Sequence, residues 1–488
     1  MNKKQLLKTG AFLLVFIAIF GYLSGILRAK QVATGGSTFV LEEFYQQEKD
    51  TVDVCFMGSS QVIWGINNMK MYEDYGISSI SVGSGDQPLL VTYFLLKEVD
   101  KRQSLKNVVL DMSMLYEKEM ESRYRRNIDG MHWSINKLQA ILAHVGSEEA
   151  ESIQSYFIDW IKYHSRWKEL SQSDFVYDDS RSSMHRGSIV SSHARPVDIP
   201  YEKFIIDNER NKTVEPAEGQ VEWFLKIIEY CDDNDIDLLL IKTPKSNWSL
   251  AKHNGVQHLA DEYGLDFLDF NFDAMLKEIG YNYGQDMWDQ EHLNIRGADK
   301  LTDYLADYLL ERKEYLDYRT VDGYSPGDVE RYHKDYKDKY LISSIDVNET
   351  FSYLKDERYD LVIQSTEDIS GGITEEMKSY LADMGVTVDL SEAAGKNYIL
   401  AVNGGQCVYE LISEEPLTYD GTFSDGLTYS AAADLNKKAN EAAIVINEAA
   451  QGFAAEGMNI AVYDNEKGEM VDLLTIYTLD GALHVYNR

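Results

Sequence analysis

Short apolar runs alternate with amphipathic helical stretches along residues 50–312, and few architectures accept that order. The expected strands are residues 52–57, 78–83, 107–111, 236–242 and 265–269. The clearest helices between them are residues 90–101, 219–233 and 249–263. Parallel strands need a long connection, usually a helix, so this alternation predicts a parallel sheet with helices on both faces. We therefore expect an α/β fold that binds its ligands at the carboxyl ends of the strands.

The first expected strand ends in Gly58-Ser59-Ser60, within the stretch DVCFMGSSQVIWGIN. Glycine and small hydroxyl residues are common in turns, so the tripeptide by itself has an ordinary structural explanation. The alternative is a nucleophilic serine on a tight strand-to-helix turn, where backbone amides can hold an oxyanion. That chemistry requires a base elsewhere in the chain.

A candidate base lies in the stretch DMWDQEHLNIRGADKL, where Asp289 and His292 precede an expected helix that begins near Arg296. The spacing allows the carboxylate to hold the imidazole Nδ1–H, which leaves Nε2 free as a base. An Asp-x-x-His also occurs as a surface pair or as two metal ligands. No further cluster of histidine or cysteine supplies the other ligands, so we expect no metal and no cofactor.

Together these motifs resemble the SGNH (GDSL-like) hydrolase superfamily, from about residue 50 to about residue 312. The resemblance implies a flavodoxin-like α/β domain with a catalytic triad. In that triad Ser60 is the nucleophile, His292 the base and Asp289 its partner, and Ser59 is the alternative nucleophile.

The same resemblance implies an oxyanion hole beside Ser60, with Gly83 in SVGSGDQPL at the position of its second glycine. We also expect oxyanion or substrate contacts from Ser59, Gln87 and Asn294. Neither VVLDMSML nor LIKTPKSNW contains a Gly-x-Asn-Asp block, so the asparagine that completes such a hole is missing. Weak activity on generic esters is the expected consequence.

A closer resemblance is to the membrane-anchored branch of that superfamily, which includes the D-alanine transfer protein of the teichoic acid pathway and the alginate O-acetylation proteins. The shared ending DxxHLN..GA.K is represented here by Asp289, His292, Asn294, Gly297 and Lys300. This resemblance implies an acyltransferase or esterase of cell-envelope polysaccharide or teichoic acid, with a membrane-bound O-acyltransferase as partner. A noncatalytic, glycan-binding envelope scaffold is the alternative, favoured by the missing asparagine.

Residues 9–27 carry no charge and follow Lys3, Lys4 and Lys8. A run of this length can just span a bilayer. A cleaved signal peptide is the competing interpretation, but Arg28-Ala29-Lys30 is not a small-x-small cleavage site. We expect residues 1–30 to be a single transmembrane anchor in the cell membrane, and the positive-inside rule places the remaining chain outside the cell.

The acidic composition excludes one class of partner. With 47 basic and 81 acidic side chains the formal net charge is −34. Such a charge repels nucleic acid, so we expect no nucleic-acid binding.

The three cysteines, Cys55, Cys231 and Cys407, are far apart and indicate no disulfide framework.

Residues 112–218 interrupt the strand and helix rhythm with an insertion rich in aromatic residues and histidine. Insertions of this size in α/β enzymes often cover the site. We expect His164 or Arg166, in YFIDWIKYHSRWKEL, to reach the pocket mouth and bind the acceptor. The structural alternative is a small satellite core formed by Tyr156, Trp160 and Trp167.

The sequence changes character after residue 312. Residues 313–340 are dense in charge and tyrosine, which is typical of a linker or an exposed helix. Residues 341–488 are expected to form an accessory domain, α/β or β-rich, with strands at 360–364, 397–402, 442–446 and 457–463. The predicted domains are therefore the anchor (1–30), the SGNH-like domain (31–312), the linker (313–340) and the accessory domain (341–488).

Two runs in the accessory domain, STEDISGGITEEMKSYLADMGV and GMNIAVYDNEKGEMVD, resemble the interleukin-like EMT inducer (GG) domain, with their order swapped. That resemblance implies sugar binding. A spacer domain without a ligand is the alternative.

Overall fold

The computed structural model describes residues 3–27, 37–117, 121–145, 152–175, 186–189, 191–199, 211–327, 329–438, 441, 443–453 and 455–487. Residues 1–2 and 28–30 of the predicted anchor lie outside this set, and so do residues 118–120, 146–151, 176–185, 190 and 200–210 of the insertion. The chain forms two compact units. The N-terminal unit comprises Met1–Ser191 and Arg195–Tyr332, and the C-terminal unit comprises Ser192–Ala194 and His333–Arg488.

A five-stranded parallel sheet forms the centre of the N-terminal unit, in the order β2-β1-β3-β4-β5. Its strands are β1 (Val54–Gly58), β2 (Ser79–Gly83), β3 (Asn107–Asp111), β4 (Asp237–Lys242) and β5 (Phe267–Asp269). All five predicted strands are confirmed to within two residues at each end. This doubly wound order changes direction between β1 and β3, and ligands of such sheets bind at that point.

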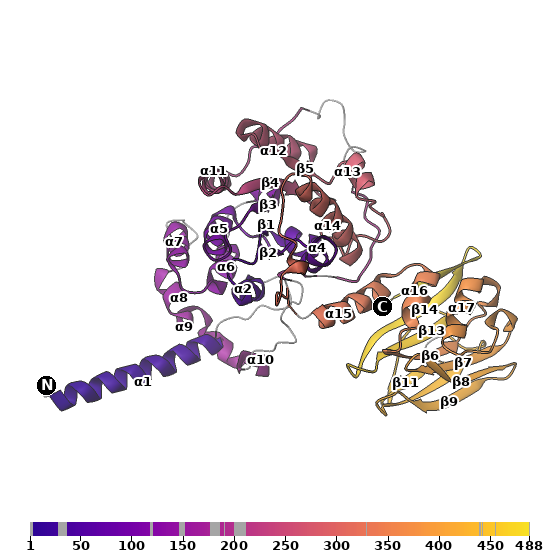
Figure 1. Ribbon diagram of the computed structural model, residues 1–488. Helices are drawn as coiled ribbons and strands as arrows, with labels where there is room; N and C mark the ends of the chain where they lie inside the picture. Colours follow the sequence, from indigo (N-terminus) through magenta and orange to yellow (C-terminus); the bar gives the residue numbers. More distant parts are fainter. Residues whose placement is uncertain are drawn as a thin grey trace. The chain divides into compact units, whose positions relative to one another are not determined.

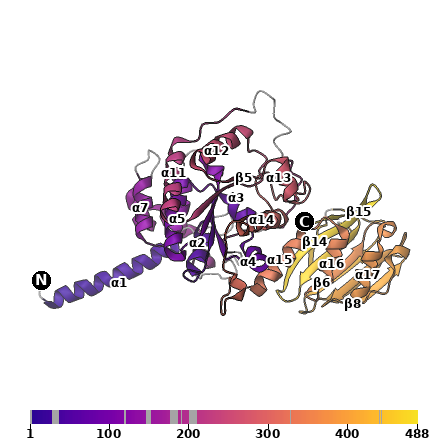
Figure 2. The same ribbon diagram turned by 45° about the horizontal axis from the view of Figure 1, so that its top comes forward.

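Helices cover both faces of this sheet, because each strand points alternate side chains to opposite sides. Cys55 and Met57 lie in one core, and Val54 and Phe56 lie in the other. The first core includes residues of α2 (Ser37–Gln46), α5 (Leu89–Gln103), α11 (Glu218–Asp233) and α12 (Leu250–Tyr263). The second includes residues of α3 (Ser60–Gly65), α4 (Asn68–Tyr75), α13 (Asp273–Glu278) and α14 (Ile295–Leu310). The predicted α/β fold is confirmed (Figures 1 and 2).

The described part of the insertion up to residue 175 is mainly helical and extends the first core, whereas residues 186–189 and 191–199 have no helix and contribute Val197 and Ile199 to the second core. Its elements are the 3₁₀ helices Met112–Tyr116 and His164–Lys168, with α6 (Glu121–Gly130), α7 (Ile135–His144), α8 (Ile153–Phe157), α9 (Asp159–Tyr163) and α10 (Gln172–Phe175). Tyr156 is buried in the first core, whereas Trp160 and Trp167 are 39% and 64% exposed. Tyr156 therefore belongs to the first core of the sheet, and the three aromatic residues do not form a separate satellite core.

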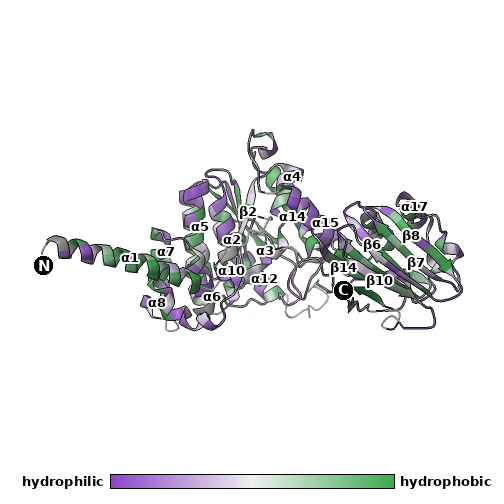
Figure 3. Cartoon of the chain, turned by 90° about the horizontal axis from the view of Figure 1, so that it is seen from below, coloured by the Kyte–Doolittle hydropathy of each residue, from purple (hydrophilic) through white to green (hydrophobic). Residues whose placement is uncertain are grey.

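Helix α1 (Lys3–Leu27) includes Leu7–Leu27, which is long and apolar enough to cross a membrane. Figure 3 shows its largely hydrophobic colouring. Only 17% of its most apolar window is buried, so α1 does not have the environment of a core helix. Length and composition are also those of a signal sequence.

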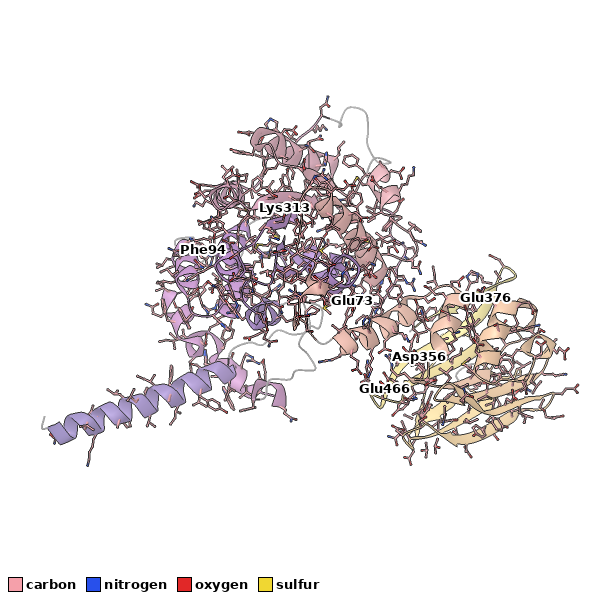
Figure 4. All side chains as sticks on the ribbon, in the orientation of Figure 1. Glu73, Phe94, Lys313, Asp356, Glu376 and Glu466 are labelled. Carbon is pink, nitrogen blue, oxygen red and sulfur yellow. The ribbon has the colours of Figure 1, made fainter. Side chains whose placement is uncertain are left out.

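The first part of the predicted linker packs on the amino ends of the parallel strands. Lys313, which is labelled in Figure 4, donates to Asp237 Oδ2 at 2.8 Å. The Tyr315 hydroxyl donates to Asn107 Oδ1 at 2.5 Å. Tyr318 is buried. This segment therefore lies at the edge of the sheet opposite the carboxyl ends.

The C-terminal unit contains two antiparallel sheets. The six-stranded sheet, in the order β15-β14-β13-β6-β7-β8, consists of β6 (Tyr359–Ser365), β7 (Asn397–Asn403), β8 (Gln406–Ser413), β13 (Met458–Asp464), β14 (Glu469–Leu479) and β15 (Ala482–Tyr486). The four-stranded sheet consists of β9 (Leu417–Thr422), β10 (Thr428–Ala433), β11 (Ile444–Ile446) and β12 (Ala449–Ala450).

One core packs α16 (Val347–Leu354) and α17 (Glu375–Asp383) on the larger of these sheets, and another joins the two sheets. Helix α15 (Val329–Ser343) leads into this unit. The predicted strands 360–364, 397–402 and 457–463 are confirmed as β6, β7 and β13 to within one residue. Of the predicted strand 442–446, residues 444–446 form β11, and residue 442 lies outside the described residues. The β-rich alternative describes the unit better than a parallel α/β layer.

Candidate active site

The ends of β1, β2 and β3 approach one another so closely that two positions require glycine. Gly58 has φ +143°, and a Cβ there would lie 3.0 Å from the Asp111 Cβ. Gly83 is opposite Gly58 in register, and a Cβ there would lie 2.8 Å from the Gly58 carbonyl oxygen. The close approach of the two strand ends thus explains why residue 83, beside the Gly58-Ser59-Ser60 turn, is a glycine.

The two serines of this turn have different environments. Ser59 is the N-cap of α3: its Oγ accepts the Gln61 N–H at 3.3 Å, and the residue is 3% exposed. Ser60 is the first residue of α3 and is partly exposed, with its Oγ 2.8 Å from His292 Nε2. Only the Ser60 hydroxyl is therefore placed to give a proton to His292.

The His292 ring is held on its other side by Asp289. Nδ1 lies 3.1 and 3.0 Å from the two carboxylate oxygens, and Asp289 Oδ1 also accepts the backbone N–H groups of Glu291 and His292 at 2.7 and 2.8 Å. Partial burial raises the pKa of the Asp289 carboxyl, but these hydrogen bonds outweigh it and leave the pKa below its ordinary value. An ionised Asp289 keeps the proton on Nδ1, so Nε2 can accept one from Ser60.

Asn294 has a structural position instead of the expected substrate contact. It is fully buried as the N-cap of α14, where Oδ1 accepts the N–H groups of Arg296 and Gly297 at 3.0 and 3.2 Å. Its Nδ2 donates to the Gln285 carbonyl at 2.5 Å. Asn294 therefore fixes the loop that carries His292 to the start of α14.

Gln87, His164 and Arg166 make hydrogen bonds elsewhere in the fold. Gln87 is fully buried, and its Nε2 donates to Thr92 Oγ1 at 3.1 Å at the start of α5. Arg166 donates to Asp174 at 2.7 Å and to the Leu27 carbonyl at 2.8 Å. His164 lies 3.2 Å from the Ile161 carbonyl oxygen and is exposed. Arg166 therefore joins the insertion to the end of α1, whereas the contact of His164 lies within the insertion.

A buried polar network that the sequence analysis missed lies beneath the triad. Lys242, at the end of β4, is fully buried; its Nζ donates to Gln61 Oε1 at 3.0 Å and lies 3.5 Å from Asp111 Oδ2. Burial lowers the pKa of the Lys242 amine below its ordinary value, against the opposite effect of Asp111. Gln61 Nε2 donates to the Glu291 carbonyl at 2.6 Å. The sequence signal for this network was a charged residue at the end of each of two apolar runs, the lysine of LLLIK and the aspartate of NVVLD.

The loop after β4 also holds the histidine loop directly. Ser246 donates to the Gln290 carbonyl from its backbone N–H at 3.0 Å and from its Oγ at 2.8 Å. Asn247 Nδ2 donates to Glu291 Oε1 at 2.7 Å, and Lys245 Nζ lies 3.3 Å from Glu291 Oε2. His292 is therefore fixed from β4 as well as from α14.

A second serine, Ser113, follows the strand next to β1. Met57 pairs with Leu110, so Ser113 follows β3 much as Ser60 follows β1. The Ser113 N–H donates to Asp111 Oδ1 at 3.0 Å, whereas its buried Oγ has no hydrogen-bond partner among the described residues. A buried hydroxyl without a partner is uncommon and calls for an explanation.

Comparisons with known proteins do not place the chain in a family. No protein-family model and no curated protein matches it. The crystal structure of a Bacteroides fragilis protein, provisionally described as an acylhydrolase, aligns with a TM-score of 0.28 and 11% identity, over 56% of this chain and 94% of that chain. A TM-score this low carries no argument about function. Any argument about function therefore rests on the geometry of the site.

The buried network predicts the effect of shortening Gln61. In Gln61→Ala, the Glu291 carbonyl and Lys242 each lose a partner, so the free energy of unfolding should fall by about 1–3 kcal/mol. A slightly displaced His292 should lower turnover of p-nitrophenyl acetate by up to about 10²-fold. Urea unfolding and ester hydrolysis measure the two effects. Gln257→Ala, which removes a surface contact to Asp261, is the control, and equal behaviour of the two variants would contradict the positioning role.

Proposed function

We propose that the chain is an SGNH-type serine acyltransferase or esterase that acts on O-acyl groups of a cell-envelope polysaccharide or teichoic acid. The observation that carries this proposal is the hydrogen-bonded series Ser60, His292 and Asp289. Its position at the carboxyl ends of the parallel strands, next to the point between β1 and β3 where ligands bind in such sheets, supports it further.

Each group of the triad has a defined part in the proposed reaction. Ser60 Oγ attacks the acyl carbonyl carbon while its proton passes to His292 Nε2. The bond from the acyl carbon to the leaving alcohol then breaks, the alcohol takes that proton, and the acyl group remains on Ser60 as an ester. An acceptor hydroxyl reverses these steps and restores Ser60, and water in the same place gives hydrolysis.

The oxyanion needs donors that the missing asparagine block does not supply. The Ser60 N–H at the start of α3 provides one. We assign the other to the unpartnered Ser113 hydroxyl, which follows the neighbouring strand β3.

The apolar helix α1 supports a membrane-anchored protein whose catalytic unit lies outside the cell. Anchoring raises the local concentration of any acyl donor embedded in the same bilayer. A membrane-bound O-acyltransferase that supplies the acyl group is the partner that this arrangement suits.

A noncatalytic glycan-binding scaffold remains the second candidate function, because the C-terminal unit has a cavity of about 750 Å³ on its smaller sheet. Tyr419 and Tyr429 line it together with Asn403 and Asp420. Tyr419 stacks on Tyr409 with ring centroids 3.8 Å apart. Aromatic rings beside amide and carboxylate groups suit a hydroxyl-rich ligand.

Covalent labelling separates the two functions and the two serines. A fluorophosphonate probe should label the full chain, should fail to label Ser60→Ala, and should still label Ser59→Ala. The Ser59 variant should instead lose about 1 kcal/mol of stability because α3 loses its cap. Labelling that survives Ser60→Ala would contradict the nucleophile assignment, and absence of labelling in the unaltered chain would favour the scaffold.

The Ser113 assignment predicts a loss confined to the chemical step. Ser113→Ala should lower kcat for p-nitrophenyl acetate by about 10²- to 10³-fold with little change in KM, because an oxyanion donor acts in the transition state. Ser113→Asn, which restores a donor, should recover part of that loss. Unchanged kcat in Ser113→Ala, with labelling of Ser60 intact, would exclude Ser113 as a donor.

Anchoring predicts a difference between polymer and soluble ester. Cells that carry a secreted form lacking residues 1–30 should acylate their envelope polymer much less than cells that carry the full chain, because the acyl donor is no longer nearby. Hydrolysis of p-nitrophenyl acetate by the two forms is the control and should be equal. Equal polymer acylation would show that anchoring does not matter and would indicate an ordinary secreted esterase.

A further inference from the structure

Two tryptophans that the proposed mechanism does not use stand beside His292. Trp64 lies near the end of α3, and Trp288 immediately precedes Asp289. Their indole rings stack with centroids 4.3 Å apart and planes at 12°. The His292 ring centroid lies 5.8 Å from Trp64 and 5.9 Å from Trp288. The Trp64–Trp288 pair is therefore next to the proposed base.

The pair is built into the same two segments that carry the reacting groups. Trp64 packs on the second core of the parallel sheet, four residues beyond Ser60 in the chain. The Trp288 backbone N–H donates to the His292 carbonyl at 2.9 Å. The positions of both rings relative to Ser60 and His292 are thus held by short, hydrogen-bonded segments.

Neither tryptophan is fully buried in the core. Trp64 and Trp288 are both only partly buried, as are Ser60 and His292, so the rings and the reacting groups share access to solvent. Neither indole N–H has a hydrogen-bond partner within the described part of the chain. Large aromatic side chains that stay partly exposed beside a reactive group are more typical of a binding surface than of a core.

The proton transfer by His292 determines which part of a substrate contacts the Trp64–Trp288 pair. The base exchanges a proton with the alcohol oxygen, so the alcohol stands next to His292 Nε2. The carbonyl oxygen of the acyl group points instead to the donors at Ser60 and Ser113. Side chains around the His292 ring therefore contact the alcohol component, which is the acceptor in transfer and the leaving group in hydrolysis.

We propose that the Trp64–Trp288 pair is the platform on which a pyranose ring of the acceptor lies, with the ring's C–H face against an indole. This inference rests on the proposed function and chooses a neutral glycan over a polyol phosphate as acceptor. A flat aromatic face matches a six-membered ring, whereas a linear polyol offers it no comparable surface. The unpartnered indole N–H groups can donate to sugar hydroxyls.

Charge supports the same choice. The formal net charge of −34 opposes a polyanionic chain such as a polyol phosphate polymer. Asp289 and Glu291 also place two carboxylates on the loop that carries Trp288.

Acyl transfer to a sugar bound in this way follows the proposed mechanism. The acceptor hydroxyl loses its proton to His292, its oxygen bonds to the acyl carbon, and Ser60 leaves as it regains that proton.

The experiment measures how the acyl group on Ser60 divides between water and an added alcohol. The full chain, in detergent, is acylated with p-nitrophenyl acetate in the presence of methyl glucopyranoside or glycerol 3-phosphate at equal concentration. We expect acetylated glucopyranoside as the favoured transfer product. The transfer-to-hydrolysis ratio compares two fates of one intermediate, so it does not depend on how much activity a variant retains.

Trp288→Ala should lower the ratio for glucopyranoside by about threefold to tenfold, the loss of one aromatic contact. Trp288→Phe should keep most of it, and Trp167→Ala, which alters an exposed tryptophan of the insertion, should keep all of it. A merely structural Trp288 would not change this ratio. Preference for glycerol 3-phosphate, or an unchanged ratio in Trp288→Ala, would overturn the proposal.

A second measurement covers failure of the proposed chemistry. Saturation-transfer NMR with methyl glucopyranoside should show contact to the sugar ring protons in the full chain and in Ser60→Ala, and reduced contact in Trp288→Ala. Binding of this kind without acylation of Ser60 would refute the enzyme and leave the platform. Acylation of Ser60 without such binding would refute the platform and leave the enzyme.

Discussion

The hydrogen bonds of one side chain, Gln61, join the three segments that make up the site. Its Oε1 accepts from Lys242 at the end of β4, and its Nε2 donates to the Glu291 carbonyl in the histidine loop. Because Gln61 directly follows Ser60, this link sets how far the serine stands from His292. A glutamine can do this because its amide both accepts and donates, which a carboxylate at the same place could not.

The hydrogen bond to Gln61 requires that Lys242 be buried without access to water. Burial of a charged amine is unfavourable unless hydrogen bonds and an opposite charge compensate. Asp111 and the polar groups of Gln61 and Thr243 provide that compensation for Lys242. The strand ends must therefore stay together, since separation of any one of them would leave a buried polar group unsatisfied. A network of this kind suits a site in which small displacements change the chemistry.

Several residues for which we expected substrate contacts make hydrogen bonds within the fold. Asn294 and Ser59 both cap helices, and the four N–H groups at a helix start need such partners. Arg166 binds a carboxylate and a carbonyl at the junction of the insertion with α1. In contrast, Trp64 and Trp288 keep exposed surface and free donors beside His292, so the groups available to a ligand are aromatic more than charged.

The sequence by itself determined the parallel sheet, its strands and the helices between them, because hydrophobic periodicity is local and survives without knowledge of contacts. It also singled out the Ser59-Ser60 turn, Asp289 and His292, since a turn after a strand and a three-residue spacing can be read along the chain. Only the tertiary structure decided that Ser60 and not Ser59 faces His292, that Lys242 is buried against Gln61, and that Trp64 stacks on Trp288. Those pairings join residues far apart in the chain, and their distances depend on how the strand ends and the histidine loop pack, which no local pattern encodes.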